Sequence, residues 1–494
     1  MPTSDRLKSI CSHLKPIDTY RQISSVLSWD QETMMPPGAI QARAHQLETL
    51  AGLIHDAWNN PRLADAMADL IDITNGKPVV ELSEIETAFM RECYPQWKRN
   101  TQLSKSLVQA LSNATSTAQH AWQHAREADD FSLFSGHLTH LIALSKEKIN
   151  ELGGAHHPYD ALIEEFEPGM SVKQLDAIFD PLKEKTIEFL QNHPKKNKPT
   201  IHGPFDEQAQ LAYSTALMGT LGYSTQNGRL DCSTHPFTMD IHPSDVRITT
   251  RIDPHYLFES ISSTIHEVGH ALYEQGLDPE WAGTPYGAPR SMGVHESQSR
   301  FWELFIGQSL PFWKGQLANL HRHFPNTASF SAQDFFHACT AIQPHWCRVK
   351  SDAITTNLHI ILRYECEKAL FDGSLTVNDL PKVWNQKMAD YLGLHIESHS
   401  KGCLQDVHWS AGLFGYFPSY TLGTLIAAEL FQVVCNELGN VPSLIASGNF
   451  DPIRQWLRVH VHQHGSKKTT QELLTDLGIA MNPQVLFDHY QCSE

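Results

Sequence analysis

Apolar residues recur three and four positions apart through most of this chain, and this spacing constrains the fold more than any other feature. The stretches from Gln41 to Ala57 and from Ser83 to Trp97 are typical of amphipathic helices that bury one face. Between Thr234 and Arg251 the pattern changes, because Thr238 to Ile241 and Asp245 to Ile252 are short, alternating and β-branched. The sequence therefore predicts a mainly α protein, a large helical body with one small β-sheet.

The length of the chain, 494 residues, exceeds that of one ordinary core and predicts either several lobes or one large helical body. Turn-forming residues interrupt the helical pattern at Asn75 to Pro78, in the Lys/Pro-rich segment from His193 to Pro204, and at Phe324 to Ala332. We expect residues 1–494 to form a single unit, with a candidate lobe boundary near 193–204 and the catalytic part at 234–424.

Composition argues against several classes of partner. A formal net charge of −17, without a long run of Lys or Arg, argues against binding to nucleic acid. No apolar run approaches the ~20 residues of a membrane span, and Met1 to Tyr20 carries charges where a secretory signal has its apolar core. The nine cysteines include no Cys-x-x-Cys pair, which suits free thiols in a reducing compartment. We therefore expect a cytoplasmic protein that binds neither nucleic acid nor membrane.

The segment from Glu259 to Gly276 carries a pattern with direct chemical meaning. Its apolar residues lie at helical spacing, with Ser260 or Ser262 as the expected N-cap and Gly276 as the C-cap. Within it, His266 and His270 stand four residues apart, so that both imidazoles face the same side of the helix. Two such imidazoles can bind one tetrahedral zinc ion.

Glu267, between the two histidines, is the expected general base. Its carboxylate can accept a proton from a zinc-activated water and deliver it to a leaving amine, so the pattern predicts hydrolysis of an amide bond. Because the chain contains 29 histidines, the motif alone arises by chance in roughly one such chain in ten. The metal-site interpretation is strengthened because the motif falls on a predicted helix that places both histidines on one side. Gly269 in mid-helix indicates that another segment packs closely there, and the upstream sheet is our candidate.

A catalytic zinc site also needs a third protein ligand. Position 276 is Gly276, so the third ligand is not a His six residues after the pair, and we expect a glutamate from a following helix. Glu296, in a predicted helix that begins at His295, is this candidate. His295 is the alternative, and since adjacent helical residues point about 100° apart, we expect only one of the two to bind. A structural alternative for Glu296 is a surface ion pair with Arg300.

Ordered motifs along the chain resemble those of the carboxypeptidase Taq family of metallocarboxypeptidases over almost the whole length. They are Asp245-Val-Arg247-Ile-Thr249, His266 to His270, His295 to Gln298, Gly402-x-x-Gln405-Asp406-x-His408-Trp409, and the segments Trp29 to Thr33 and Gly415 to Tyr420. The resemblance implies a helical body with a deep active-site cleft between two halves, a homodimer, and zinc or cobalt as the metal. It also implies peptide substrates that are hydrolysed at the C-terminal peptide bond.

One motif departs from the family pattern. Where the family has Ile-Arg-x-x-Ala-Asp, this chain has Cys347-Arg348-Val-Lys350-Ser351-Asp352. Ala353 and Thr356 stand where many family members carry Glu and Tyr. These changes leave the zinc chemistry untouched, but they lie beside a candidate substrate-binding arginine. We therefore expect them to alter affinity or the preferred peptide length.

Arg348 is the candidate anchor for the terminal carboxylate of a peptide. We expect it on a helix from Trp346 to Ala369, where a bidentate guanidinium–carboxylate pair would fix the peptide end beside the zinc. Such an anchor distinguishes an exopeptidase from an endopeptidase. The structural alternative is a salt bridge between Arg348 and Asp352 at i,i+4. The resemblance favours the substrate-binding role.

Three further residues are candidates for the substrate site. Arg247, in the predicted strand, could orient substrate, although a structural pair with Asp245 or Thr249 suits the alternation of the strand better. His408 and Tyr420 could each donate a hydrogen bond to the developing oxyanion. A buried core role is the alternative for both.

Together these features predict a metal-dependent carboxypeptidase. One alternative is a zinc oligopeptidase, which would share the zinc site but cut internally because no group anchors the peptide terminus. The other is a peptide-binding relative that has lost catalysis. The intact set of His266, Glu267, His270 and Glu296 argues against that second alternative.

Overall fold

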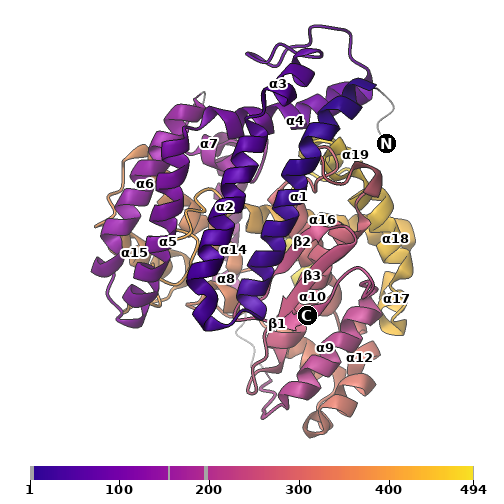
Figure 1. Cartoon of the computed structure of the whole chain (residues 1–494). Helices are drawn as coiled ribbons and strands as arrows, with labels where there is room; N and C mark the ends of the chain where they lie inside the picture. Colours follow the sequence, from indigo (N-terminus) through magenta and orange to yellow (C-terminus); the bar gives the residue numbers. More distant parts are fainter. Residues whose placement is uncertain (1–4, 154–155, 194–198, 493–494) are drawn as a thin grey trace.

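The computed structural model describes residues 5–153, 156–193 and 199–492, and it consists of helices around one three-stranded sheet (Figure 1). This arrangement confirms the predicted mainly α fold with a single small sheet. The elements before the sheet are α1 (Asp5–Thr33), η1 (Pro37–Ala39), α2 (Ile40–Trp58), α3 (Pro61–Ala68), α4 (Glu84–Gln102), α5 (Lys105–Glu127), α6 (Ser132–Leu152), α7 (Asp160–Ile163), α8 (Val172–Asn192) and α9 (Glu207–Leu221).

The elements after the sheet are also helical. They are α10 (Leu257–Gly276), η2 (Pro279–Trp281), α11 (Met292–Arg300), η3 (Phe301–Gly307), α12 (Leu310–His323), η4 (Pro325–Thr327), α13 (Ala332–Thr340), η5 (Arg348–Lys350), α14 (Thr356–Asp372), α15 (Leu380–Leu392), α16 (Pro418–Leu438), α17 (Val441–Ser447), α18 (Asp451–His460), η6 (His462–Lys467), α19 (Thr470–Asp476) and α20 (Pro483–Cys492).

The N-terminal helices follow the predicted spacing. α2 covers the predicted stretch 41–57, and α4 covers most of 83–97. Ser83 fixes the start of α4, because its hydroxyl accepts the N–H of Glu86 while the Glu86 carboxylate accepts the N–H of Ser83. This reciprocal capping box satisfies two backbone donors at the helix end.

The sheet comprises β1 (Leu230–Cys232), β2 (Thr238–His242) and β3 (Asp245–Thr250), in the order β1-β3-β2. β1 is parallel to β3, and β2 is antiparallel to it. β2 and β3 are the two predicted strands, although β3 ends at Thr250, before the expected Ile252. β1 was not predicted, because its three residues are too few to show a pattern.

The sheet lies between α1 and α10. Arg247 of β3 points to one face, where its guanidinium stacks over the ring of Trp29 in α1 at 4.5 Å from the centroid. Thr250 points to the other face, where its hydroxyl lies 2.9 Å from that of Ser263 in α10. Figure 1 shows α1 running in front of β2 and β3. The sheet therefore separates the first helix of the chain from the helix that carries the histidine pair.

Two hydrophobic clusters hold the helices together. The smaller one consists of residues from α1, α2, α3 and α4 and from the segment between α3 and α4, together with Trp281 and Tyr286, which follow α10. The larger one extends from Leu107 to Tyr490 and includes residues on both sides of the segment 193–204. The division between the clusters thus falls between α4 and α5. Residues 194–198 of the candidate lobe boundary lie outside the described residues, and the lobe division stays a prediction.

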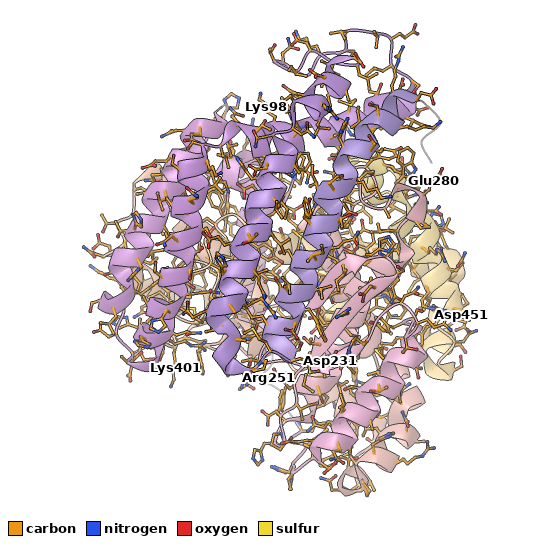
Figure 2. The ribbon with its side chains drawn as sticks, viewed as in Figure 1. Lys98, Asp231, Arg251, Glu280, Lys401 and Asp451 are labelled. Carbon is orange, nitrogen blue, oxygen red and sulfur yellow. The ribbon has the colours of Figure 1, made fainter. Side chains whose placement is uncertain are left out.

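Charged side chains such as Lys98, Glu280 and Asp451 lie at the periphery of the molecule (Figure 2). In the described ranges, no helix combines the length and the apolar character needed to cross a bilayer.

Candidate metal centre

α10 brings His266, Glu267 and His270 into the interior of the protein. The helix begins at Leu257, earlier than predicted, and the expected serine cap was wrong because no side chain caps its first turn. Ser260 instead donates its hydroxyl to Oε1 of Gln210 in α9 at 2.7 Å. The first residues of α10 are apolar and buried, so core packing rather than a cap fixes this end.

The side chains of His266, His270 and Glu296 meet at one point. Each offers one ligand atom, and these atoms all lie within 4.8 Å of one another. Oε2 of Glu296 is 3.7 Å from Nε2 of His266 and 3.4 Å from Nε2 of His270. Glu296 comes from α11, which packs against α10. The side chains of His266 and His270 are 19% and 13% exposed, so solvent reaches the centre.

Two carboxylates and one arginine form a buried network on the His266 side. Nδ1 of His266 lies 2.8 Å from Oε2 of Glu303, a residue of the π-helical segment η3 that continues α11. Arg300 donates from Nε to Oε1 of Glu296 at 2.7 Å and from Nη1 to Oε2 of Glu303 at 3.1 Å. The Glu296–Arg300 ion pair considered as an alternative therefore exists, but it is buried. It occupies Oε1, while Oε2 of Glu296 faces the imidazoles and also accepts the Ser299 hydroxyl at 3.2 Å.

His295 contacts the Nδ1 side of the His270 ring, while Nε2 of His270 faces Glu296. Nδ1 of His270 lies 2.6 Å from Nδ1 of His295, and Nε2 of His295 lies 2.7 Å from Oε1 of Glu274. These contacts orient the imidazole of His270 and direct its Nε2 to the centre. Between the two candidates for third ligand, the geometry favours Glu296 over His295.

The electrostatics of the centre favour a cation. Burial alone lowers the pKa of His266, but the carboxylates of Glu296 and Glu303 raise it to about 9. Burial lowers the pKa of His270 to about 3, against the opposing contact with Glu296. The pKa of Glu296 is held well below its ordinary range, because Arg300 and His266 outweigh the effect of burial. The negative charge of Glu296 and Glu303 that holds a proton on His266 would equally favour a divalent metal ion in place of that proton.

Glu267 is buried beside this centre, and burial raises the pKa of its carboxyl. Thr238, the first residue of β2, donates its hydroxyl to Oε2 of Glu267 at 2.6 Å. No hydrogen bond among the described residues reaches Oε1, which leaves that oxygen to exchange a proton. The small sheet therefore holds the carboxyl group in place.

Two glycines let α11 approach its neighbours. A Cβ atom at Gly269 would lie 2.6 Å from both the carbonyl oxygen of Gln298 and the Cα of Ser299. A Cβ atom at Gly423 of α16 would lie 2.6 Å from Cβ and Cγ of Glu296. The prediction that the sheet approaches Gly269 was wrong. The neighbour is α11, the helix that carries the third candidate ligand.

Arg348 lies in the short segment η5, so the predicted continuous helix from Trp346 to Ala369 was wrong. The carboxylate of Asp352 explains the interruption. Its Oδ1 accepts the backbone N–H of Thr355 at 2.8 Å, and its Oδ2 accepts the Thr355 hydroxyl at 2.6 Å. Such local bonds at an aspartate start a new helix rather than continue one.

The guanidinium of Arg348 pairs with Asp406, so the alternative pairing with Asp352 was also wrong. Nε and Nη2 of Arg348 lie 3.0 Å and 2.9 Å from Oδ1 of Asp406. The same guanidinium stacks over the ring of Tyr420 at 4.8 Å from the centroid. Nε2 of His408 lies 3.1 Å from the Tyr420 hydroxyl. The structure thus gathers Arg348, His408 and Tyr420 into one cluster.

The residues that depart from the family pattern bond to the backbone around Arg348. The Ser351 hydroxyl donates to the carbonyl of Cys347 at 3.0 Å, and the Thr356 hydroxyl donates to the carbonyl of Arg348 at 3.4 Å. Ala353 is buried. These side chains shape the turn that presents the arginine.

Arg247 has structural partners on its own face of the sheet. Its Nε and Nη2 lie 2.9 Å and 2.8 Å from the two carboxylate oxygens of Asp245, and Trp29 covers its guanidinium. This environment agrees with the structural interpretation. A role in substrate binding stays a prediction.

Sequence reasoning missed the residues that support the metal centre and the arginine. These are Thr238, Glu274, Arg300 as a bridge, Glu303 and Asp406. Glu303 left a local signal, since it follows Glu296 by seven residues and shares its side of the helix. The pairing of Arg300 with Glu296 was considered, but its second bond to Glu303 was not. The contacts of Thr238, Glu274 and Asp406 depend on tertiary packing.

The chain is similar to known proteins over almost its whole length. Residues 9–492 match the carboxypeptidase Taq (M32) metallopeptidase family. The chain is 39% identical over 459 residues to thermostable carboxypeptidase 1 of Thermus thermophilus, and the match covers 90% of this chain and 89% of that protein. It is 39% identical over 482 residues to carboxypeptidase 1 of Bacillus subtilis, covering 96% and 95%.

The fold itself is shared with a solved relative. The structure of Trypanosoma cruzi metallocarboxypeptidase 1 matches with a TM-score of 0.92 at 34% identity, covering 99% of each chain. The predicted family is therefore confirmed by sequence and by fold. The chain belongs to the carboxypeptidase Taq (M32) family of metallopeptidases and is a peptide hydrolase of the metallocarboxypeptidase type.

Proposed function

We propose that this enzyme removes the C-terminal residue of peptides by zinc-dependent hydrolysis, with Glu267 as the general base. The observation that carries the proposal is the convergence of His266, His270 and Glu296 within 4.8 Å, beside the buried carboxyl of Glu267. Two imidazoles and one carboxylate are a ligand set of catalytic zinc, and they leave one position open.

The residues present fit such an ion. Glu303 and His295 contact the Nδ1 atoms of the two histidines, which leaves both Nε2 atoms available to coordinate a metal ion. Zinc bound there supplies Lewis acidity, which acidifies water and polarises a scissile carbonyl. We propose zinc as the resident ion, with cobalt able to take its place.

The side chains around the centre then have separate roles. Glu267, held by Thr238, accepts a proton from water and delivers it to the leaving amine. Tyr420 or His408, whose side chains are hydrogen-bonded to each other, donates to the developing oxyanion. Arg348 binds the terminal carboxylate, and a role for Arg247 in orienting the peptide remains part of the proposal.

The wider context of the proposal follows the family resemblance and the composition. We propose that residues 1–494 act as one metallocarboxypeptidase unit, with the catalytic part at 234–424 in a deep cleft, and that the enzyme is a homodimer. The free cysteines of the described residues support a cytoplasmic location. The net charge of −17 supports peptides rather than nucleic acid as the substrates.

The C-terminal specificity can be tested with Arg348→Ala. The substrates are an amino-terminally blocked dipeptide and its C-terminal amide, and the readout is kcat/KM with metal content measured in the same sample. We expect the free acid to lose about 30- to 900-fold in kcat/KM, corresponding to ~2 to 4 kcal/mol for a charge-assisted pair, with metal content unchanged. Wild-type enzyme should discriminate strongly against the amide.

Arg458→Ala is the matched control, since Arg458 is exposed on α18. It should behave as wild type with both substrates. Equal cleavage of free and amidated peptides by wild-type enzyme, at internal bonds, would mean that the protein is a zinc oligopeptidase built on the same centre. Binding without cleavage, in a sample with a full complement of metal, would indicate a peptide-binding relative.

A further inference from the structure

Asp406 contacts two arginines at once, and this arrangement suggests a role beyond charge neutralisation. Its Oδ1 faces Nε and Nη2 of Arg348 at 3.0 Å and 2.9 Å. Its Oδ2 accepts from Nε of Arg363 at 2.7 Å and also from Nη2 of that residue. Each carboxylate oxygen therefore serves a different guanidinium.

Arg363 is a fixed support on α14. Its side chain is fully buried, its Nη1 donates to the carbonyl oxygen of His359 at 2.7 Å, and its guanidinium stacks over the ring of Trp384 at 4.6 Å. Through two hydrogen bonds it holds Asp406 in one orientation. The position of Oδ1 is therefore set by the core of the protein.

Arg348 is less enclosed but held on several sides. Asp406 takes the Nε side of its guanidinium, the ring of Tyr420 covers one face, and the Arg348 N–H donates to Oε1 of Gln405 at 3.0 Å. Among the described residues, Nη1 of Arg348 has no hydrogen-bond partner. The guanidinium is thus held in place, and its Nη1 remains available to bind a ligand.

The charges in this cluster do not balance. Two guanidinium groups share one carboxylate, Asp406, and the neighbouring His408 adds no charge because burial lowers its pKa to about 3. Glu367, which also interacts with Arg363, is mostly protonated below pH 7 because burial raises its pKa to about 7. Below that pH one positive charge therefore remains in a buried setting. A peptide carboxylate would supply the missing negative charge and satisfy Nη1.

We infer that Asp406 is a positioning residue for substrate, which orients Arg348 so that its free nitrogen meets the terminal carboxylate of a peptide. The inference rests on the proposed function, in which Arg348 is the anchor. Asp406 acts through Arg348 and does not touch the substrate itself. Arg363 in turn holds Asp406 and supplies the surplus charge.

The test compares Asp406→Asn with Asp352→Asn in the metal-loaded enzyme. Both substitutions remove one carboxylate charge from a residue next to the Arg348 segment, but Asp352 caps a helix and does not contact the guanidinium. The substrates are the blocked dipeptide and its C-terminal amide. Where the amide is cleaved too slowly, its binding is measured as a competitive inhibition constant.

We expect Asp406→Asn to lower kcat/KM for the free acid by about 10-fold or more, mainly through KM, because the anchor loses its orientation. The amide should be affected by less than about 2-fold, so the acid-to-amide ratio falls, and metal content stays constant. Asp352→Asn should keep the ratio even if it lowers thermal stability. A loss of equal size on acid and amide would mean that Asp406 is only structural and would overturn the inference.

Arg348→Ala separates this inference from the proposed function. In that background, Asp406→Asn should cause no further loss on the free acid, because the residue it positions is gone. If Arg348→Ala leaves the acid-to-amide ratio unchanged, the proposed C-terminal anchor is wrong. If Arg348→Ala lowers the ratio while Asp406→Asn leaves it intact, the anchor stands and only the positioning role is wrong.

A second variant covers the case in which Asp406→Asn does not fold. Asp406→Leu combined with Arg363→Leu replaces both partners of the buried pair with apolar groups, a change that proteins often tolerate. Arg348 then lacks its orienting carboxylate in a folded protein. The same fall in the acid-to-amide ratio is expected, and an unchanged ratio would overturn the inference.

Discussion

Glu303 holds the imidazole of His266 by a contact of 2.8 Å between Oε2 and Nδ1. Glu296, seven residues earlier on the same helical run, directs its own Oε2 to the other nitrogen of that ring at 3.7 Å. Arg300 lies between the two glutamates and bonds to both. One continuous stretch of α11 and η3 therefore supplies a candidate ligand, the residue that orients another ligand, and the arginine that joins them.

Glu303→Gln should weaken metal binding by about 10- to 100-fold, the usual effect of losing a carboxylate partner of a ligand histidine. The amide can still contact Nδ1, but it no longer carries the negative charge that favours a cation at the centre. Competition with a chromophoric chelator measures the affinity. Glu184→Gln on the exposed side of α8 is the control and should bind metal as wild type. Equal affinities in all three proteins would contradict the orienting role of Glu303.

Gly423→Ala should displace Glu296, because the added Cβ would lie 2.6 Å from Cβ and Cγ of that side chain. We expect a loss of about 1 to 3 kcal/mol in the free energy of unfolding, typical of overpacking, together with weaker metal binding. Gly52→Ala in the middle of α2 is the matched control, since a Cβ atom added there would meet nothing within 4 Å. That change should stabilise the protein by about 0.5 to 1 kcal/mol. Unaltered metal affinity in Gly423→Ala would mean that α11 adjusts without moving the ligand.

Glu367 should make a contribution to stability that is lost as pH rises from about 4.5 to 7. This buried carboxyl accepts hydrogen bonds from the Tyr159 hydroxyl, Nε1 of Trp409 and the N–H of Gly415. Burial nevertheless raises its pKa from the ordinary 4.5 to about 7. Between these values the folded protein holds the proton more tightly than the unfolded chain, so the free energy of unfolding decreases with pH, by up to about 3 kcal/mol, and levels off above 7.

Urea denaturation of Glu367→Gln at several pH values measures this contribution. The variant should lack the part of the pH dependence that Glu367 causes, so the free energy of unfolding of wild type minus that of the variant should decrease between pH 4.5 and 7. Glu365→Gln is the control, because Lys183 and Lys387 lower the pKa of Glu365 despite burial. Its contribution is lost only as the pH falls below 4.5, so this variant should parallel wild type between 4.5 and 7. A Glu367→Gln curve parallel to wild type would contradict the raised pKa.

The helical core of the centre could be predicted because its signals are local. His266 and His270 lie one helical turn apart, and the apolar residues around them keep the same period over the whole of α10. Glu296 could be predicted for a similar reason, since it lies near the start of a second stretch of helical periodicity soon after the first. The fold class followed from the same periodicity, repeated through most of the chain.

The surroundings of Arg348 could not be predicted, because two effects compete there. Helical spacing runs through Asp352, but the side chain of that residue bonds to the backbone of Thr355 and starts a separate helix. The true partner, Asp406, lies far along the chain and meets Arg348 only in the folded protein. The neighbour of Gly269 was missed for the same reason, since a mid-helix glycine shows that something packs closely but not which segment it is.

The central claim, that Glu267 transfers protons beside a metal held by His266, His270 and Glu296, is tested most directly by Glu267→Gln. The amide keeps the shape of the side chain but cannot accept the proton. Elemental analysis and kcat should be measured on the same preparation. The account predicts one zinc per chain, as in wild type, with kcat reduced by about 100- to 10,000-fold. Activity within about 2-fold of wild type, or loss of the metal together with the activity, would contradict it.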